Sequence, residues 1–272
     1  MILKKVDRSK YKEYMEYAEG CKANRVYPLS IACGTQEGDI YTDNNGCVLF
    51  WHYCGFAYLS GDPGAPVLEE IYQKLLVAET ERRFILITDS ESVTDHYSGR
   101  DRLRFDKRIE YDHGGIPEKL PELDDSFAVE FISAENIADI QGRITPAFSW
   151  KDSDTFLRDG FGLMARSRED RSFAAVAFSA AVSPEEVDIG VETAEAYRHH
   201  GLASYLAYRM CGEITDKGKK AVWAHAETNE GSRQIACSAG FRACRINTVI
   251  HKKIFSDDIR PDLWRKFFYN YC

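Results

Sequence analysis

The sequence lacks the apolar segments of a membrane or exported protein. Its 272 residues contain no apolar run long enough to span a lipid bilayer. The stretch from Met1 to Tyr17 is charged throughout, so we expect no signal peptide. We therefore expect no membrane partner.

Cysteines at metal-ligand spacing are missing as well. The eight cysteines are scattered and none forms a Cys-x-x-Cys pair. The pairs Cys47/Cys54 and Cys237/Cys244 are too loosely spaced for the usual zinc patterns. We expect reduced thiols in a cytoplasmic protein, and no metal site.

Basic residues are fewer than acidic ones, 35 against 43. The net charge is −8, whereas nucleic-acid binding needs a basic surface, so we expect no nucleic-acid partner. An acidic protein also suits a cationic amine as a ligand. Apolar residues make up 44% and aromatic residues 12%, which is enough for sizeable cores and excludes global disorder. The length suits two domains of ordinary size.

The first part of the chain, up to about residue 110, has the pattern of an α/β block. Helices are predicted over Lys10–Lys22 and Val67–Glu79, and strands over 46–53, 55–59, 84–88 and 100–105. The Asp62-Pro63-Gly64 turn lacks the Gly-x-x-x-x-Gly-Lys phosphate pattern, so we interpret it as a plain turn. We assign His52 to core and hairpin packing rather than to a ligand site.

A stretch rich in glycine, proline and charge, from Asp112 to Asp125, is predicted to be a linker. We therefore expect an N-terminal α/β domain over residues 1–120 and a second domain over 121–272. The second domain's predicted strands are 127–132, 161–166, 172–178, 187–192, 220–226 and 244–251, and its predicted helices start at Ser133, Trp150, Gly201, Ser232 and Phe255. This order predicts a mixed β-sheet flanked by helices, an α/β or α+β fold.

One stretch of the second domain has the pattern of an anion site. Val187–Glu192 alternates apolar and polar residues as a half-buried strand does, and Gly201 stands where a helix begins. The free backbone N–H groups and the positive dipole end of such a helix suit a phosphate. We predict that N–H groups from Arg198 through Ala203 hold the pyrophosphate of a cofactor, with Gly201 allowing close approach.

Two motifs resemble the GNAT acyl-coenzyme A N-acyltransferase superfamily. Residues Arg198–Ala203 fit its Arg/Gln-x-x-Gly-x-Gly/Ala pyrophosphate loop. Its Asn-x-x-Ala-x-x-Leu-Tyr-x-Lys-x-Gly-Phe segment is matched in spacing by Asn229, Ser232, Ile235, Gly240 and Phe241. The resemblance covers about Phe127 to His251 in element order.

Within the superfamily, the chain resembles the group that includes zwittermicin A resistance proteins. The Asp-Ile-Gly strand, Tyr-Arg-x-x-Gly-Leu-Ala and Asn-Glu-x-Ser carry this resemblance, together with the looser Phe56–Pro63 phrase. The resemblance implies that the N-terminal block is a second, degenerate copy of the fold without a cofactor loop.

The resemblance implies acetyl-coenzyme A as the acyl donor and a set of residues that hold it. Pantetheine would insert beside the strand that ends near Val191. The expected cofactor-binding residues are Ile189, Val191, Thr193, Arg198, His199, His200, Gly201, Leu202, Ala203 and Asn229. The two histidines either touch phosphate or are solvated loop residues.

Acyl transfer to an amine needs a base, stabilisation of an oxyanion and a proton for the thiolate. We expect Glu192 at the strand end to be the base, with His225 and Glu227 as rivals; the alternative for Glu192 is a solvated strand-end glutamate. The superfamily's usual acid is a tyrosine, and Ala236 stands in its place. The thiolate would then take its proton from another group or from water.

These patterns predict an N-acetyltransferase that acts on a small-molecule amine by direct transfer in a ternary complex. The N-terminal block would wall the acceptor site, and the protein would be a monomer or homodimer. The rival hypothesis is a coenzyme A binding or sensing module without turnover, which Ala236 favours slightly. The intact Arg198–Ala203 loop disfavours a purely structural protein.

Overall fold

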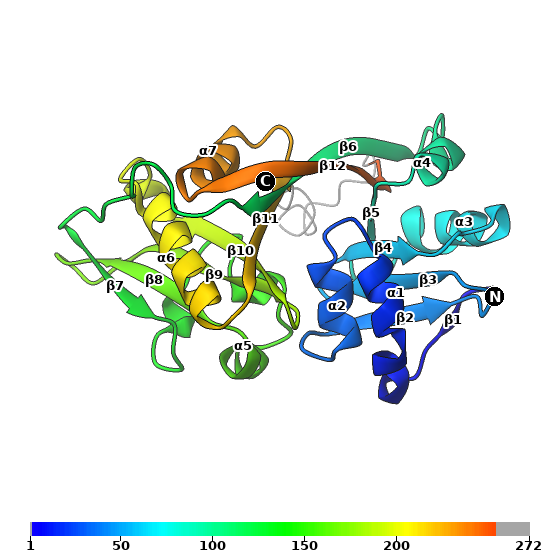
Figure 1. Cartoon of the computed structure of the whole chain (residues 1–272), viewed down its shortest axis with the longest axis horizontal. Coiled ribbons are helices and arrows are strands. Elements are labelled where there is room, and N and C mark those ends of the chain that lie inside the picture. Colours follow the sequence, from blue (N-terminus) through cyan, green and yellow to red (C-terminus); the bar gives the residue numbers. More distant parts are fainter. Residues whose placement is uncertain (1, 254–272) are drawn as a thin grey trace. The chain divides into compact units, whose positions relative to one another are not determined.

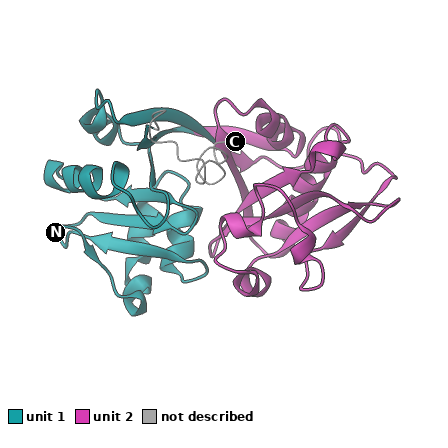
Figure 2. Ribbon diagram, turned by 180° about the vertical axis from the view of Figure 1, so that it is seen from behind, with its two compact units in different colours: residues 1–109, 246–272 teal, residues 110–245 magenta. Residues whose placement is uncertain are grey.

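The chain divides into two compact units. The structure, a computed structural model, describes residues 2–253. Unit 1 contains Met1–Ile109 and Ile246–Cys272, and unit 2 contains Glu110–Arg245 (Figure 2). The functional domains expected over 1–120 and 121–272 stay a prediction. The helix predicted over Phe255–Cys272 lies outside the described residues.

Unit 1 is a mixed sheet with short helices. Its elements are β1 (Lys4–Lys5), η1 (Arg8–Tyr14), α1 (Met15–Gly20), α2 (Val26–Ala32), β2 (Gly38–Thr42), β3 (Val48–His52), β4 (Phe56–Ser60), α3 (Ala65–Ile71), its π-helical continuation η2 (Tyr72–Leu76), β5 (Ile85–Thr88), α4 (Glu91–Tyr97) and the start of β6 (Leu103–His113). The strand order is β1-β2-β3-β4-β5-β12. The β4–β5 pair is parallel, whereas β1–β2, β2–β3, β3–β4 and β5–β12 are antiparallel.

Unit 2 is a second mixed sheet. Its elements are the end of β6, then β7 (Phe127–Phe131), η3 (Ile137–Asp139), η4 (Pro146–Phe148), α5 (Ser153–Asp159), β8 (Gly162–Ser167), β9 (Phe173–Val182), β10 (Glu186–Thr193), η5 (Glu195–Tyr197), α6 (Leu202–Asp216), β11 (Lys220–Ala226), α7 (Glu230–Ser238) and the start of β12 (Phe241–Lys252). The strand order is β6-β11-β10-β9-β8-β7. Helix α6, yellow in Figure 1, packs across β8 to β11. The predicted fold class, a mixed sheet flanked by helices, is confirmed.

The two units repeat one order of elements. A strand, short helical segments, three strands, a helical region, a strand, a helix and a strand run from β1 to β6 and again from β7 to β12. The parallel pair β4–β5 of unit 1 corresponds to β10–β11 of unit 2. In unit 1 the strand next to β5 is β12, and in unit 2 the strand next to β11 is β6. Each unit therefore takes the last strand of the other repeat beside its own fifth strand.

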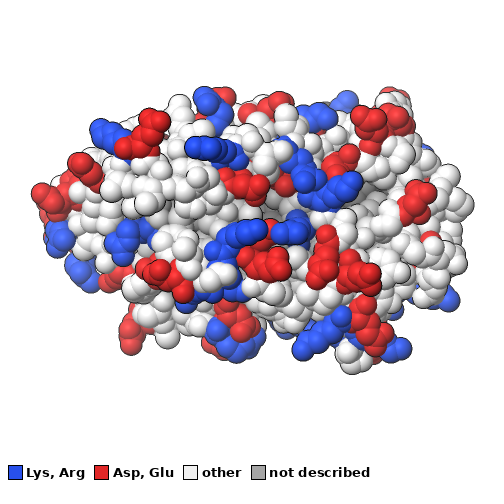
Figure 3. Space-filling model, viewed as in Figure 1, with Lys and Arg blue, Asp and Glu red and all other residues white. Residues whose placement is uncertain are grey.

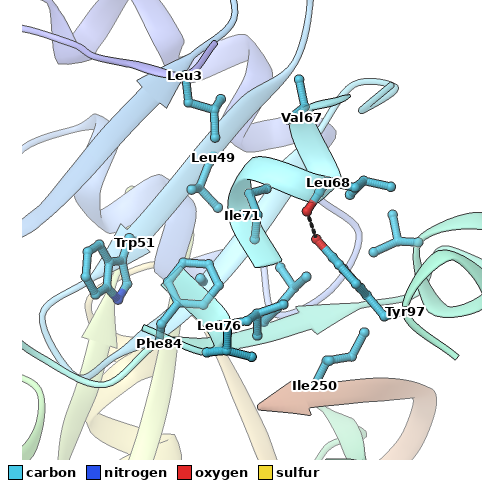
Figure 4. Close-up of a cluster of buried hydrophobic side chains, with 14 of the residues drawn as sticks. Leu3, Leu49, Trp51, Val67, Leu68, Ile71, Leu76, Phe84, Tyr97 and Ile250 are labelled. Carbon is cyan, nitrogen blue, oxygen red and sulfur yellow. Dashed lines mark hydrogen bonds between the residues drawn. The ribbon is translucent and has the colours of Figure 1, made fainter. Parts of the chain in front are cut away.

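The core of unit 1 gathers around α3 and α4. Leu68 and Ile71 of α3 and Ile250 of β12 are among its buried residues (Figure 4). Leu86 of β5 belongs to the same cluster. The Tyr97 hydroxyl donates a hydrogen bond to the Leu68 carbonyl at 2.8 Å, which joins the two helices. Because Ile250 is fully buried here, the C-terminal strand contributes to the N-terminal core.

Several predicted elements differ from the observed ones. The helix predicted from Ser133 is only the short 3-10 turn η3, because the Asn136 side chain accepts the Ser133 N–H and donates to the Phe131 carbonyl. The helix predicted over Lys10–Lys22 is a 3-10 helix followed by α1. Strand β6 continues through His113, so it takes up the first residues of the predicted linker.

In the part of the chain that the structure describes, no helix is both long and apolar enough to cross a membrane.

Candidate functional site

The ladder between β10 and β11 opens partway along the two strands. Their parallel pairing joins Glu186 to Lys220 and ends at Asp188 with Val222, although β10 continues to Thr193 and β11 to Ala226. On its other side, β10 stays paired with β9 through Thr193, with a register shift between Asp188 and Ile189. A bulge bends a strand and changes its twist. The segment past the bulge therefore has one side of its backbone paired with β9, while its ladder with β11 has ended.

This segment carries three of the predicted cofactor contacts. Ile189, Val191 and Thr193 all lie beyond the point where the β10–β11 ladder ends. Their backbone is the part of β10 that an extended ligand could join as if it were a strand. Their role in cofactor binding stays a prediction.

The loop after β10 leads to the start of α6. Gly201 is the N-cap of α6 in the left-handed conformation, with φ 74°, and His199 just before it has φ 70°. A Cβ on Gly201 would meet no atom within 4 Å, so the backbone conformation, and not crowding, requires glycine in this structure.

The N-terminus of α6 offers unpaired donors. The first intrahelical hydrogen bond of this end runs from the Tyr205 N–H to the Gly201 carbonyl at 3.0 Å. The N–H groups of Leu202, Ala203 and Ser204 therefore have no partner within the helix. Together with the helix dipole, they suit an anion.

The exposed loop residues beside this end differ in their contacts. His200 lies 3.2 Å from the Asp124 carboxylate through its Nδ1, and its ring contacts Phe127. Arg198 and His199 are exposed. The Ser126 backbone N–H, then the His200 contact and the Ser126 hydroxyl, lower the pKa of Asp124. His200 thus ties the loop to the start of β7.

A pocket of about 630 Å³ lies at the same end of α6, within unit 2. One side consists of Gly201 and Ser204 of the helix start, and another of Cys237 and Ser238 at the end of α7. The third side is the segment 114–122, which the sequence predicted to be a linker. Nothing in its local pattern indicated this position, because the pocket joins this segment to residues of α6 that lie far along the chain.

Helix α7 shows how the second motif is used. The Asn229 side chain accepts the Ser232 N–H at 2.9 Å and so caps the helix. The Ser232 hydroxyl in turn accepts a hydrogen bond from the Trp223 ring N–H. Ala236, at the place of the superfamily's usual tyrosine, is fully buried. The neighbouring Cys237 is an exposed free thiol.

The end of β11 presents the two rival bases differently. His225 is buried, with Nδ1 2.7 Å from the Ala226 carbonyl and Nε2 3.0 Å from the Tyr111 hydroxyl. Because a carbonyl only accepts, Nδ1 carries the proton and Nε2 accepts from Tyr111. Both ring nitrogens are thus engaged by the protein itself. Glu227, by contrast, is exposed.

Glu192, the first choice of base, is engaged as well. Its Oε2 accepts the backbone N–H groups of Arg143 at 3.2 Å and Ile144 at 2.9 Å. The structure thus brings Glu192 to the loop between η3 and η4, a contact that the sequence did not indicate.

Among residues 2–253, no group of three or more histidine, cysteine, aspartate or glutamate side chains is arranged to hold a metal ion. All the cysteines in this range are free thiols.

Comparison with known proteins gives a family and a fold. The family model described as GNAT acetyltransferase matches residues 22–249. No curated protein is significantly similar to the chain in sequence.

Solved structures resemble nearly the whole chain. A GCN5-related N-acetyltransferase-like protein from Streptococcus suis 89/1591 has a TM-score of 0.69 at 18% identity, and the match covers 91% of this chain and 100% of that one. An acetyltransferase of the GNAT family from Colwellia psychrerythraea has a TM-score of 0.60 at 11% identity, covering 93% and 99%. A tandem GNAT protein from the clavulanic acid biosynthesis pathway has a TM-score of 0.60 at 10% identity, covering 94% and 99%. At these identities the likeness shows a shared fold.

Proposed function

The chain belongs to the GNAT acetyltransferase family, and on that premise we propose that it transfers an acetyl group from acetyl-coenzyme A to a small-molecule amine. The observation that carries the proposal is the joint presence, in unit 2, of an open β10–β11 ladder and an α6 N-terminus with unpaired donors. An acyl donor that is both extended and anionic needs both features.

The donor's phosphates would lie at the start of α6. The N–H groups of Leu202 and Ala203 point along the helix axis toward its N-terminal end, and the exposed Arg198 adds positive charge nearby. Gly201 leaves open space at this end, so a phosphate can approach the backbone.

The nucleotide end of the donor would occupy the pocket lined by Gly201, Cys237 and segment 114–122. Lys119 and Arg242 also line it and supply positive charge for a phosphate. The extended arm would run along Ile189, Val191 and Thr193, with Asn229 near its path. When bound, acetyl-coenzyme A supplies an activated thioester whose acetyl group an amine can attack directly.

The chain's own residues have three tasks in this reaction. They must hold the donor's carbonyl for attack, take a proton from the amine and keep the acceptor in place. Backbone N–H groups beside the Asp188/Ile189 register shift are candidates for the first task. Of the three predicted bases, Glu227 is the exposed one, whereas Glu192 and His225 are engaged within the protein.

We assign the N-terminal repeat to a degenerate copy of the same fold, as in the tandem arrangement that one structural neighbour's name describes. Its turn before α3 is poor for phosphate, because Pro66 removes an N–H from the first helical turn. The finer resemblance to zwittermicin A resistance proteins fits this proposal, as do a wall for the acceptor site, a cytoplasmic location and a monomer or homodimer.

We propose no nucleic-acid partner. On the face that Figure 3 shows, basic side chains are interspersed with acidic ones. Nucleic-acid binding favours a surface on which basic residues gather.

The first experiment replaces Gly201 with glutamate. A carboxylate at the mouth of the α6 N-terminus would repel the pyrophosphate and occupy its donors. We expect Gly201→Glu to weaken coenzyme A binding by at least about 100-fold in calorimetry.

The matched control is Gly218→Glu at the other end of α6. Gly218 has φ 72°, close to the 74° of Gly201, and a Cβ there also meets no atom within 4 Å. Both variants therefore carry similar backbone strain, of about 1 kcal/mol. Equal affinities of the two variants for coenzyme A would contradict the assignment of the pyrophosphate site to the N-terminus of α6.

Turnover is tested by thiol release from acetyl-coenzyme A over a panel of small amines. Release that depends on the amine supports the enzyme. Saturable coenzyme A binding without release for any amine would instead support the sensing module that Ala236 favours.

A further inference from the structure

The segment between η3 and η4 is a loop fixed at both ends. On one side, the Arg166 guanidinium binds the carboxylate of Asp139, the last residue of η3. On the other side, the buried Trp150 donates from its ring N–H to the Ser179 carbonyl of β9 at 2.8 Å. Between these anchors, residues 141–143 are exposed and have no regular secondary structure.

The middle of this loop is held by the side chain of Glu192. Its Oε2 accepts two backbone N–H groups in succession, from Arg143 at 3.2 Å and from Ile144 at 2.9 Å. A carboxylate that accepts hydrogen bonds from two backbone N–H groups makes charge-assisted hydrogen bonds, which are stronger than neutral ones. Glu192 therefore closes the loop onto the end of β10.

Gly142 shows how close this contact is. A Cβ on Gly142 would lie 2.5 Å from Cγ and 3.0 Å from Cδ of Glu192, and its φ of 118° is one that other residues rarely adopt. Only glycine allows the loop backbone to pass so near the carboxylate. The fit thus depends on both partners, the glycine of the loop and the glutamate of the strand.

The contact lies on the part of β10 whose ladder with β11 has ended. Glu192 pairs with Val176 of β9, and it lies four residues beyond Asp188, where the ladder with β11 ends. The loop therefore covers the same part of β10 that borders the open ladder. An amine that attacks a thioester held along this strand must approach past the strand end.

We propose that Glu192 is a positioning residue, which fixes the 142–144 loop as one wall of the amine-acceptor site, and not the base that deprotonates the amine. This inference rests on the proposed acetyl transfer for its meaning, but the contact itself can be tested without turnover. The role needs a hydrogen-bond acceptor at Oε2 and does not need a group that takes up a proton.

The first test is limited proteolysis of the full-length protein with trypsin, which cleaves after arginine. Cleavage after Arg143 requires the loop to open, and its rate follows the open population. We expect Glu192→Ala to raise this rate at least about tenfold, because the hydrogen bonds from the Arg143 and Ile144 N–H groups are lost. Glu192→Gln keeps an acceptor oxygen of the same reach, so its rate should stay within about twofold of the unchanged protein.

Two further variants control this test. Glu195→Ala removes an exposed carboxylate three residues away and should leave cleavage after Arg143 unchanged. Gly142→Ala disturbs the contact from the loop side and should act like Glu192→Ala. Equal cleavage rates for Glu192→Ala and Glu195→Ala would overturn the proposal, whatever the enzyme's activity.

The second test is kinetic and distinguishes a positioning role of Glu192 from a role as the base. If Glu192 only positions the loop, Glu192→Ala raises the KM for the amine at least about tenfold with kcat nearly unchanged. Glu192→Gln then has a KM close to that of the unchanged protein. The coenzyme A affinity stays the same in both variants. If Glu192→Gln instead lowers kcat about 100-fold or more and removes the acidic limb of the pH–rate profile, Glu192 is the base and the proposal is wrong.

Discussion

His52 shows what complete burial does to a single ionisable group. Its side chain is fully buried on β3, with Nδ1 accepting the Cys54 N–H and its ring at 90° to the Tyr27 ring. Burial, and then the charge of Arg82, lower the pKa of His52 to about 3 from an ordinary 6.5. The sequence assigned this histidine to packing, and its surroundings are those of a core residue.

The shifted pKa of His52 predicts a dependence of stability on pH. Between about pH 3 and 6.5 the unfolded chain binds a proton at this residue that the folded chain refuses, so the free energy of unfolding falls as the pH drops through this window. Replacing His52 by glutamine should make the fall shallower, by up to about 1.4 kcal/mol per pH unit. The measurement is urea denaturation of both proteins at about pH 4.5, 5.5, 6.5 and 7.5, which cover the upper part of this window and the range above it. Parallel curves would contradict this account.

Residue identity could be predicted at the site, whereas residue contacts could not. Gly201 was expected at the helix start and has the left-handed conformation that favours glycine. Glu192 was expected as a base, and nothing near it in the sequence indicated Gly142 or Ile144 as partners. A side chain's chemistry is local, but its partners are set by the path of a chain segment about 50 positions away.

At the scale of elements, local signals worked where side chains bond their own backbone. Asp152 caps α5, because its Oδ1 accepts the Thr155 N–H at 2.8 Å at the start of the helix. Asn136 shows the opposite outcome, since its local bonds replace a helix with a turn. The same kind of side chain can begin a helix or prevent one.

The α5 cap can be tested by substitution. Asp152→Ala leaves the Thr155 N–H without its acceptor and should lower the free energy of unfolding by about 1 kcal/mol. Asp152→Ser keeps a capping oxygen and should lose about half of that or less. Chemical denaturation of the three proteins measures the difference. A result in which serine destabilises as much as alanine would show that the cap is not the cause.

The elements of the cofactor loop illustrate a limit of periodicity. The alternation of Val187–Glu192 predicted a strand correctly, and β10 covers it. The same alternation cannot say that pairing with β11 ends at Asp188, because the two strands separate only in three dimensions. The family resemblance implied only that a ligand inserts beside this strand, and the register of the two strands shows where their ladder ends.

At the scale of the whole molecule, the last strand of each repeat serves the other unit. Residues 246–252 of β12 lie in unit 1, where Thr248, Val249 and Ile250 pair with β5. Ile250 is fully buried in the same cluster as Ile71 (Figure 4). The stability of the N-terminal unit should therefore depend on a residue near the other end of the described chain.

Substitutions in β12 test this dependence. Ile250→Ala opens a cavity in the unit 1 core and should cost about 2–5 kcal/mol of that unit's stability. Hydrogen exchange in the intact protein should then speed up in β5, whereas the β9 amides of unit 2 should change little. Ile246→Ala on the same strand is the control, because Ile246 is 58% exposed. Equal effects of the two substitutions would contradict the assignment of Ile250 to this core.

The sequence by itself determined the fold class, the start of α6 at Gly201 and the motifs that resemble the GNAT family, because periodicity, capping and glycine conformation are local properties of the chain. Tertiary structure alone decided three other matters: that segment 114–122 lines the pocket at the α6 N-terminus, that β12 completes unit 1, and that Glu192 holds the 142–144 loop. Each of these joins segments far apart along the chain. Such contacts form because strands need partners for their backbone groups and apolar side chains need a common core, and no local pattern names the partner.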